Sequence, residues 1–257
     1  MQLEIAALSK AGGRAINEDA CGVWSSADGC FCVLSDGAGG HGGGDVASKL
    51  AVSRVLEWFR RQPRCTPEAV EGALMAANRA IVEQQKSERK LADMRATIVV
   101  LALDTLHGIA FWGHLGDSRL YCFRGGRLLV QTRDHSVVQS MVDAGYVKPG
   151  DLRTTPHRSR LLGALGDAGR FEPTVERQHF SLADGDAFLL CTDGCWEFVE
   201  EAEMGQALLE ANSGEDWLRV LERQVLSHSK PGQDNYSAIA IWCRNPAEET
   251  QIRLSRQ

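Results

Sequence analysis

The sequence predicts an α+β fold built on antiparallel β-sheet. Short apolar segments typical of strands lie near both ends of the chain and in its middle, with amphipathic helical segments between them. Two neighbouring apolar segments, 119–123 and 127–132, are joined through Gly125-Gly126, which is a signal for a β-hairpin and hence for antiparallel pairing. No repeat, low-complexity tract or proline-rich linker divides the 257 residues, so we expect one domain over residues 1–257.

The predicted elements follow one another in blocks. Three strands come first, then two helices and four strands. A polar stretch containing glycine and arginine, 146–170, precedes two more strands, two helices and a last strand. The strands are predicted at 3–8, 20–24, 31–34, 96–103, 109–115, 119–123, 127–132, 175–180, 187–192 and 237–242, and the helical stripes at 52–59, 70–81, 204–211 and 218–225. Each helix has a single apolar face, so each should cover one side of a sheet.

The composition is that of an ordinary globular protein, with 44% hydrophobic residues, 24% charged residues and a net charge of −6. A mildly acidic chain lacks the clustered Lys and Arg of sequence-independent nucleic-acid binding, so we expect no nucleic-acid partner. The longest apolar run, 96–103, is too short to span a bilayer, and the N-terminal residues do not have the basic and apolar regions of a signal peptide. We expect a monomeric cytoplasmic protein that does not bind a membrane.

Eight cysteines are scattered along the chain without a C-x-x-C pair, which argues against a zinc site or a disulfide framework. Most lie in apolar runs, such as Cys32 in "FCVL" and Cys191 in "FLLC". We expect them to be small buried hydrophobic residues.

A glycine-rich stretch, "LSDGAGGHGGGDVAS" at 34–48, has two interpretations. Gly37, Gly39 and Gly42 satisfy G-x-G-x-x-G, the dinucleotide fingerprint, and the stretch lies between an apolar strand and a helix. A dinucleotide fold, however, needs a parallel strand directly after that helix, and here a second helix follows. A nicotinamide-dependent oxidoreductase therefore remains only as an alternative, which a lack of cofactor binding would exclude.

Acidic turns at the ends of apolar segments are the second unusual feature. "FCVLSDG" and "FLLCTDG" both end in Ser/Thr-Asp-Gly and deliver Asp36 and Asp193. Three more acidic turns contain Glu18 and Asp19, Asp117, and Asp234. Clustered carboxylates repel one another unless cations are present, and hard oxygen ligands select Mg²⁺ or Mn²⁺.

Six short motifs, taken in order, resemble those of the metal-dependent serine/threonine protein phosphatases of type 2C in their compact bacterial form. The motifs are R-x-x-N-E-D at 14–19, D-G-x-G-G-H at 36–41, G-D-S-R at 116–119, D-H-S at 134–136, T-D-G at 192–194 and D-N-Y-S at 234–237. They span nearly the whole chain. Each is weak alone, but their shared order is specific.

The resemblance implies a four-layer sandwich of two antiparallel sheets flanked by helix pairs, with a flap subdomain at about 138–171 and a binuclear Mn²⁺ or Mg²⁺ centre at one end. It implies that Asp36 bridges both ions, that the Gly37 carbonyl binds one, and that Asp193 and Asp234 complete the other. Glu18 and Asp19 would hold metal-bound waters, and Asp117 with Asp193 would hold a third ion. The glycines would then let the backbone pack around Asp36 instead of binding a nucleotide.

The expected reaction is hydrolysis of phosphoserine and phosphothreonine in proteins by in-line attack of a metal-bridging hydroxide. Arg14 is the candidate phosphate clamp, because a guanidinium can bind two oxygens at once. The proton for the leaving alkoxide has two candidate donors, His41 and a metal-bound water, since the position that donates it in animal relatives falls on Ala38.

Phosphorylated proteins are the expected partners, together with a bacterial Ser/Thr kinase whose action the enzyme would oppose. Other phosphatase chemistries lack their signatures: no cysteine is followed six residues later by arginine, and "GDSRL" lacks the histidine of the other binuclear phosphatase fold. A catalytically silent binding module of the same fold is the remaining alternative, although none of the metal carboxylates is missing.

Overall fold

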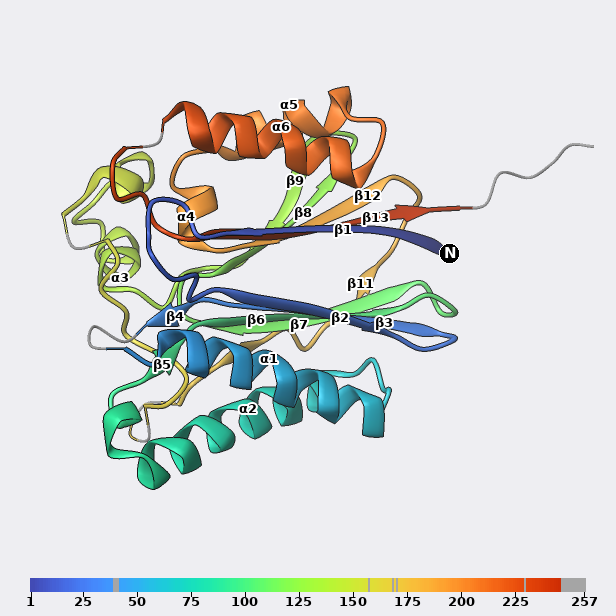
Figure 1. Ribbon diagram of the computed structural model, residues 1–257. Helices are drawn as coiled ribbons and strands as arrows, with labels where there is room; N and C mark the ends of the chain where they lie inside the picture. The colour runs from blue at the N-terminus through green and yellow to red at the C-terminus, as the bar shows by residue number, and fades with distance from the viewer. Residues whose placement is uncertain (39–41, 157, 168, 170, 229, 246–257) are drawn as a thin grey trace, which may run out of the picture.

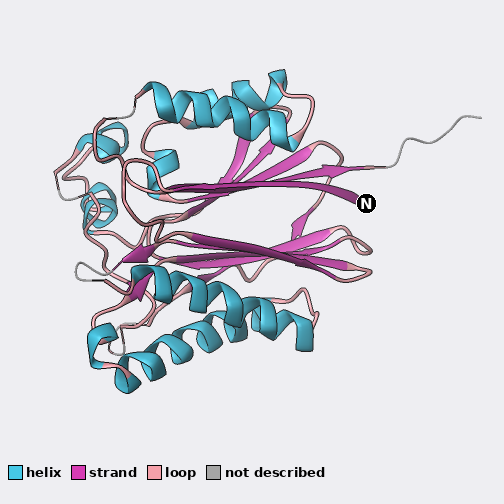
Figure 2. Ribbon diagram, in the orientation of Figure 1, coloured by secondary structure: helices cyan, strands magenta, loops and turns pink. Residues whose placement is uncertain are grey.

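The computed structural model describes residues 1–38, 42–156, 158–167, 169, 171–228 and 230–245. Two antiparallel sheets lie face to face, and a pair of helices covers the outer face of each (Figures 1 and 2). The predicted four-layer α+β sandwich is therefore confirmed. Among the described helices, none combines the length and the apolar character that crossing a membrane requires.

One sheet has the strand order β10-β7-β6-β3-β2, with β11 also paired to β7. Its strands are β2 (Ala20–Ser25), β3 (Gly29–Ser35), β6 (Ile98–Asp104), β7 (Ile109–Leu115), β10 (Thr174–Val175) and β11 (Phe180–Ser181). The interior strand β3 is buried along its whole length, because the second sheet covers one of its faces and helices cover the other. Since β3 pairs antiparallel with both neighbours, the parallel crossover of a dinucleotide-binding unit is not formed.

The other sheet has the order β1-β13-β12-β8-β9. Its strands are β1 (Gln2–Lys10), β8 (Arg119–Arg124), β9 (Arg127–Gln131), β12 (Asp186–Cys191) and β13 (Tyr236–Arg244). The predicted hairpin between β8 and β9 is confirmed: Gly125 and Gly126 have φ values of 56° and 74°, which the favoured two-residue hairpin turn requires.

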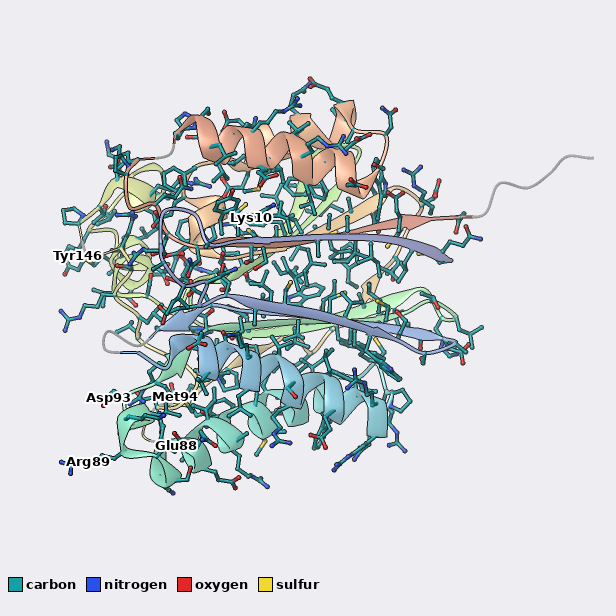
Figure 3. All side chains as sticks on the ribbon, in the orientation of Figure 1. Lys10, Glu88, Arg89, Asp93, Met94 and Tyr146 are labelled. Carbon is teal, nitrogen blue, oxygen red and sulfur yellow. The ribbon has the colours of Figure 1, made fainter. Side chains whose placement is uncertain are left out.

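The helices use the apolar stripes predicted from their spacing. α1 (Gly44–Arg61) and α2 (Pro67–Ser87) pack on the six-stranded sheet, and α5 (Glu201–Glu210) and α6 (Gly214–Ser227) on the five-stranded one. The Thr66 hydroxyl accepts a hydrogen bond from the Ala69 N–H and so caps α2. Side chains fill the space between the layers (Figure 3).

All eight cysteines are free, and six of them are buried, as expected for small hydrophobic residues. Cys21 and Cys65 are partly exposed.

Three features of the fold differ from the sequence prediction. The strand predicted at 175–180 is wrong as one element: β10 and β11 are separate, and each forms two residue pairs with β7. The strand predicted at 96–103 is interrupted at Thr97, where the short strand β5 (Arg95–Ala96) pairs with β4 (Gly37–Ala38) before β6 begins. No helix is predicted between the strand at 127–132 and the end of the polar stretch at 170, yet α3 (Val137–Asp143) lies before that stretch and the 3-10 helix η2 (Pro149–Thr154) lies within it.

The short elements gather at one end of the sandwich. α3, α4 (Asp193–Trp196), β4 and β5 lie at the same end in Figure 1, together with the chain segment that joins β1 to β2. The acidic turns identified in the sequence lie at this end.

Candidate metal and phosphate site

Asp36 directly follows the last residue of β3. Its backbone N–H donates to Thr97 Oγ1 (3.1 Å), and its carbonyl accepts from the Thr97 N–H (2.8 Å). The next residue, Gly37, donates its N–H to the Glu18 carbonyl (3.1 Å). A Cβ at Gly37 would lie 2.1 Å from the Gly44 carbonyl oxygen, so the backbone here packs too closely for any side chain. This agrees with the predicted role of the glycine beside Asp36.

Glu18 and Asp19 precede β2 and face the end of the other sheet. The Glu18 N–H donates to Asn235 Oδ1 (2.8 Å), and the Asn235 amide donates to the Ile16 carbonyl (3.0 Å), which fixes the turn. Asp19 is only 5% exposed and accepts a hydrogen bond from the Thr192 hydroxyl (3.0 Å) on Oδ2. Its Oδ1 is buried without a hydrogen-bond partner among the described residues.

Asp193 and Asp234 come from the five-stranded sheet. Asp193 begins α4, with Thr192 between it and β12, and Asp234 lies two residues before the start of β13. Arg14 Nη2 donates to Asp234 Oδ2 (3.0 Å), and both side chains are about half exposed. Arg14, the candidate phosphate clamp, is therefore held in place by Asp234, a candidate metal ligand.

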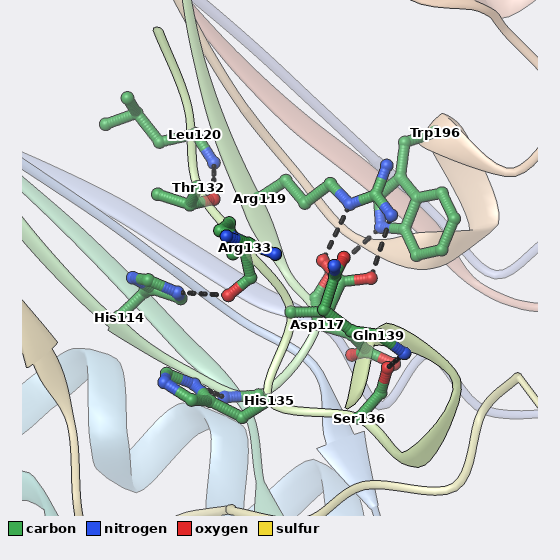
Figure 4. A network of polar contacts seen from close by, with 12 residues as sticks. His114, Asp117, Arg119, Leu120, Thr132, Arg133, His135, Ser136, Gln139 and Trp196 are labelled. Atoms are coloured by element: carbon green, nitrogen blue, oxygen red, sulfur yellow. Dashed lines mark hydrogen bonds and ion pairs between the residues drawn. The ribbon is translucent and has the colours of Figure 1, made fainter. Parts of the chain in front are cut away.

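Asp117 lies in the tight turn between β7 and β8 and is 5% exposed. The Trp196 indole N–H donates to the Asp117 carbonyl (2.9 Å), and the Gly116 N–H donates to His135 Nδ1 (3.1 Å). The hydroxyls of Ser118 and Thr97 are 2.6 Å apart, so Thr97 connects this turn with Asp36. Figure 4 shows Asp117 between Trp196 and the loop that carries His135.

A buried ion pair supports the Asp117 turn. Arg119 binds both carboxylate oxygens of Asp134, at 2.7 and 2.8 Å, and its guanidinium lies 3.5 Å from the centre of the Trp196 ring (Figure 4). Two donors to one carboxylate and a stacked aromatic face are a geometry that lysine could not reproduce. The motifs G-D-S-R and D-H-S contained these residues, but their letters did not show that Arg119 and Asp134 pair.

These segments enclose a cavity of about 540 Å³. Its lining includes Arg14, Glu18, Asp36, Gly37, Asp117, Asp193 and Asp234. Asp19 is not in this lining, and His41 lies outside the described residues. The other five lining residues, Ala38, Thr97, Ser159, Leu161 and Asn235, are not among the site residues predicted from the sequence.

Burial and mutual repulsion dominate the electrostatics of this cavity. Burial raises the pKa of Asp36 well above its usual range, and the charges of Asp193 and Asp19 raise it further. Burial likewise raises the pKa of Asp19 to about 6 and that of Asp193 to about 7. For Asp117, burial and then the charge of Asp193 raise the pKa well above the usual range. A negative charge at these positions is therefore costly unless cations are nearby.

The donor set suits a hard divalent cation. Every predicted side-chain ligand is a carboxylate, the type of oxygen donor that Mg²⁺ and Mn²⁺ select. The buried Asp19 Oδ1 is available as an acceptor, and a cation would relieve the repulsion that raises the pKa values. As the side chains are placed, however, no three His, Cys, Asp or Glu residues within the described segments are arranged to hold a metal ion. Binding would require side-chain rotation, above all of Asp234, which is paired with Arg14.

Known proteins with similar sequences and structures are phosphatases. The profile of the family described as Protein phosphatase 2C matches residues 9–233. The chain is 33% identical over 228 residues to the serine/threonine protein phosphatase PstP of Mycobacterium tuberculosis (strain CDC 1551 / Oshkosh), a match that covers 88% of this chain and 42% of PstP. It is 31% identical over 231 residues to the serine/threonine phosphatase stp of Listeria welshimeri, covering 88% of this chain and 89% of stp.

A crystal structure of the PstP catalytic domain in complex with two manganese ions shares the fold, with a TM-score of 0.80 and 29% identity over 95% of this chain and 99% of that one. The present chain thus spans less than half the length of PstP and most of the length of stp. The motif order predicted this family, and the comparisons confirm the family and its fold. The chain belongs to the protein phosphatase 2C family.

Proposed function

We propose that this chain hydrolyses phosphoserine and phosphothreonine in proteins with the help of two Mn²⁺ or Mg²⁺ ions. The observation that carries the proposal is the acidic cavity, in which carboxylates from both sheets converge beside an exposed arginine. The names of the relatives and the two manganese ions of the PstP structure support the same class of reaction.

The carboxylates divide into three groups by place. Asp36 would bridge the two ions, the Gly37 carbonyl would bind one of them, and Asp193 with Asp234 would bind the other. Glu18 and Asp19 would act through water, which fits the position of Asp19 outside the cavity lining. Asp117 with Asp193 would hold a third ion at the turn that Trp196 and His135 support.

When bound, such ions supply a nucleophilic water for in-line attack at phosphorus and screen the dianionic substrate from the acidic cavity. Arg14 would bind the phosphoryl oxygens. Its ion pair with Asp234 holds the guanidinium at the cavity before substrate arrives, and half of its side chain is exposed and can turn towards a ligand.

The proton donor can be identified by comparing leaving groups. A serine or threonine alkoxide needs a proton as it leaves, whereas p-nitrophenolate does not. If His41 donates that proton, His41→Ala slows hydrolysis of a phosphothreonine peptide but not of p-nitrophenyl phosphate. If a bound water donates the proton, His41→Ala hydrolyses both substrates at the wild-type rate.

The cellular setting is also a proposal. A phosphoprotein phosphatase opposes a kinase that phosphorylates the same residues, so we expect a bacterial Ser/Thr kinase as its counterpart. All eight cysteines are free, which suits the reducing cytoplasm. We also propose that segment 138–171 acts as a flap over the cavity, since Ser159 and Leu161 line it, and that the protein is a monomer, which light scattering can test.

The deciding experiment is hydrolysis of a phosphothreonine peptide and of p-nitrophenyl phosphate with Mn²⁺, with Mg²⁺ and with excess chelator. We expect turnover with either metal and none in chelator. Turnover in chelator would contradict the metal mechanism. Absence of turnover with either metal would favour the silent binding module.

A further inference from the structure

A second cavity, of about 730 Å³, is lined by residues of both sheets. Residues of β7 and β9, which belong to different sheets, form its walls together with α3 and the segments around 162 and 174. Trp112, Val130 and Leu162 make part of the wall apolar. Its size is that of a ligand site, and nothing in the proposed reaction uses it.

A single segment of the proposed flap separates this cavity from the acidic one. Ser159 and Leu161 line the acidic cavity, whereas Leu162 and Gly163 line the second. The segment is held against the D-H-S motif: the Leu162 N–H donates to the His135 carbonyl (2.8 Å). A chain that crosses this wall would therefore reach both cavities.

His114 lines the second cavity and carries a buried acceptor nitrogen. Its side chain is 3% exposed, and Nε2 lies 2.8 Å from the Arg133 carbonyl, so Nε2 carries the proton and Nδ1 has a free lone pair (Figure 4). Among the described residues, Nδ1 has no hydrogen-bond partner. Burial lowers the pKa of His114 to about 4, so the ring stays neutral and Nδ1 can only accept.

The unpaired charge of the lining is negative. Arg133 is paired with Asp143 and so does not neutralise other groups. Glu172 and Glu176 line the cavity, and neither forms an ion pair within the part of the chain that the structure describes. Two carboxylates, a buried acceptor nitrogen and an apolar wall together favour a ligand with an apolar stem and a cationic head.

We propose that this second cavity binds a lysine or arginine side chain close in sequence to the phosphorylated residue of the substrate. Trp112 and Leu162 would pack against the methylene groups, and Glu172, Glu176 and His114 would receive the charged head. The inference rests on the proposed function, because it assigns a substrate preference to the same enzyme. We assign the basic side chain to the peptide substrate itself because a single segment separates the second cavity from the acidic one.

The test uses phosphothreonine peptides that differ at one position. Lysine is placed in turn at each of several positions on either side of the phosphothreonine, and norleucine, which has a similar stem without the charge, is its control. With Mn²⁺ present, we expect kcat/KM to be about tenfold higher for the best-placed lysine than for norleucine. The double variant Glu172→Gln/Glu176→Gln should lower that ratio to about one.

Two further variants keep the result specific. Glu83→Gln changes an exposed glutamate of α2 outside both cavities and should preserve the tenfold ratio. Glu176→Lys should make lysine worse than norleucine, because like charges repel.

The outcomes separate the two proposals. Hydrolysis with no lysine preference at any position overturns the basic-side-chain site and leaves the proposed function intact. A preference that the double variant retains also overturns it, since the charge is then recognised elsewhere. If no phosphopeptide is hydrolysed with Mn²⁺ or Mg²⁺, the proposed function itself fails.

Discussion

Arg14 and Asp234, 220 residues apart in the chain, form an ion pair at 3.0 Å across the mouth of the acidic cavity. The candidate phosphate clamp and a candidate metal ligand are thus partners of each other. An arginine in this position limits the repulsion around Asp234. When metal and substrate bind, Arg14 would have to leave the Asp234 carboxylate and bind the phosphoryl group instead.

Arg14→Ala should therefore impair substrate use more than metal binding. We expect kcat/KM to fall about 100-fold, because a two-pronged, charge-assisted contact to phosphate is lost. Mn²⁺ affinity should stay within a few-fold of wild type, since Asp234 is released from its competing partner. Steady-state kinetics and calorimetric Mn²⁺ titration measure the two effects. Arg14→Lys should recover only part of the loss, and a wild-type kcat/KM in Arg14→Ala would contradict the assignment.

Asp36→Asn should abolish both metal binding and turnover. The substitution keeps the side-chain shape, but it removes the charge that would bridge two cations, so we expect turnover to fall by several orders of magnitude at any substrate concentration. The matched control is Asp93→Asn, at an exposed aspartate outside the cavity lining, which should behave as wild type. Retained Mn²⁺ and retained turnover in Asp36→Asn would contradict the site.

Much of this architecture could be predicted because the spacing of apolar residues specifies it. The helix α1 buries Val52, Val55, Leu56 and Phe59, the four positions of the predicted stripe. The failures have a common physical cause. Thr97 interrupts a continuous apolar run because its hydroxyl and backbone bind Asp36, and β10 and β11 are short because each follows the edge of β7 for two residues. Such tertiary contacts leave no periodic signal.

The candidate site shows the same division. Turn motifs predicted Asp36, Asp117, Asp193 and Asp234, and the structure brings them to one cavity. The support behind them could not be predicted, because Arg119, Asp134 and Trp196 lie in three separate segments and only the fold makes them neighbours. The roles of the ligands stay predictions, which substitution of Asp36, Asp117 and Asp193 would test.

Asp117→Asn should affect the third ion and leave the other two in place. Asp117 lies in its own turn between β7 and β8, apart from the segments that carry Asp36 and Asp234. We expect two Mn²⁺ ions to stay bound, with turnover about tenfold or more below wild type. Calorimetric titration counts the ions. Loss of all metal binding would show that Asp117 belongs to the core pair.

His135 should position the Asp117 turn through one nitrogen. Nδ1 accepts from the Gly116 N–H (3.1 Å), so the neutral ring carries its proton on Nε2 and donates to Thr174 Oγ1 (2.9 Å). His135→Ala should raise the Mn²⁺ concentration for half-maximal activity about fivefold, the worth of about one hydrogen bond. His135→Asn places an acceptor near Nδ1 and should restore the wild-type value, whereas His135→Gln should not. Equal behaviour of Asn and Gln would indicate only a packing role.

Because of the acidic cavity, the metal-free protein should become less stable to unfolding as pH rises towards neutrality. Burial raises the pKa of Asp19 to about 6 and of Asp193 to about 7, well above the value near 3.8 of an exposed aspartate. Between about pH 4 and pH 7 the folded protein therefore holds protons that the unfolded chain has released. The resulting stabilisation is complete below about pH 4 and is lost as pH rises through 6 to 7.

Thermal unfolding in chelator can isolate this contribution. Asp193→Asn removes one titrating group, so the wild-type protein should lose about 2 kcal/mol relative to that variant between pH 5.5 and pH 7.5, or about 5 °C in Tm. Saturating Mn²⁺ should flatten or reverse the wild-type trend, because metal binding requires the ionised carboxylates and competes with protons. A wild-type Tm that follows the variant across this range, with and without Mn²⁺, would show that Asp193 ionises normally and that the cavity carboxylates do not repel as the geometry indicates.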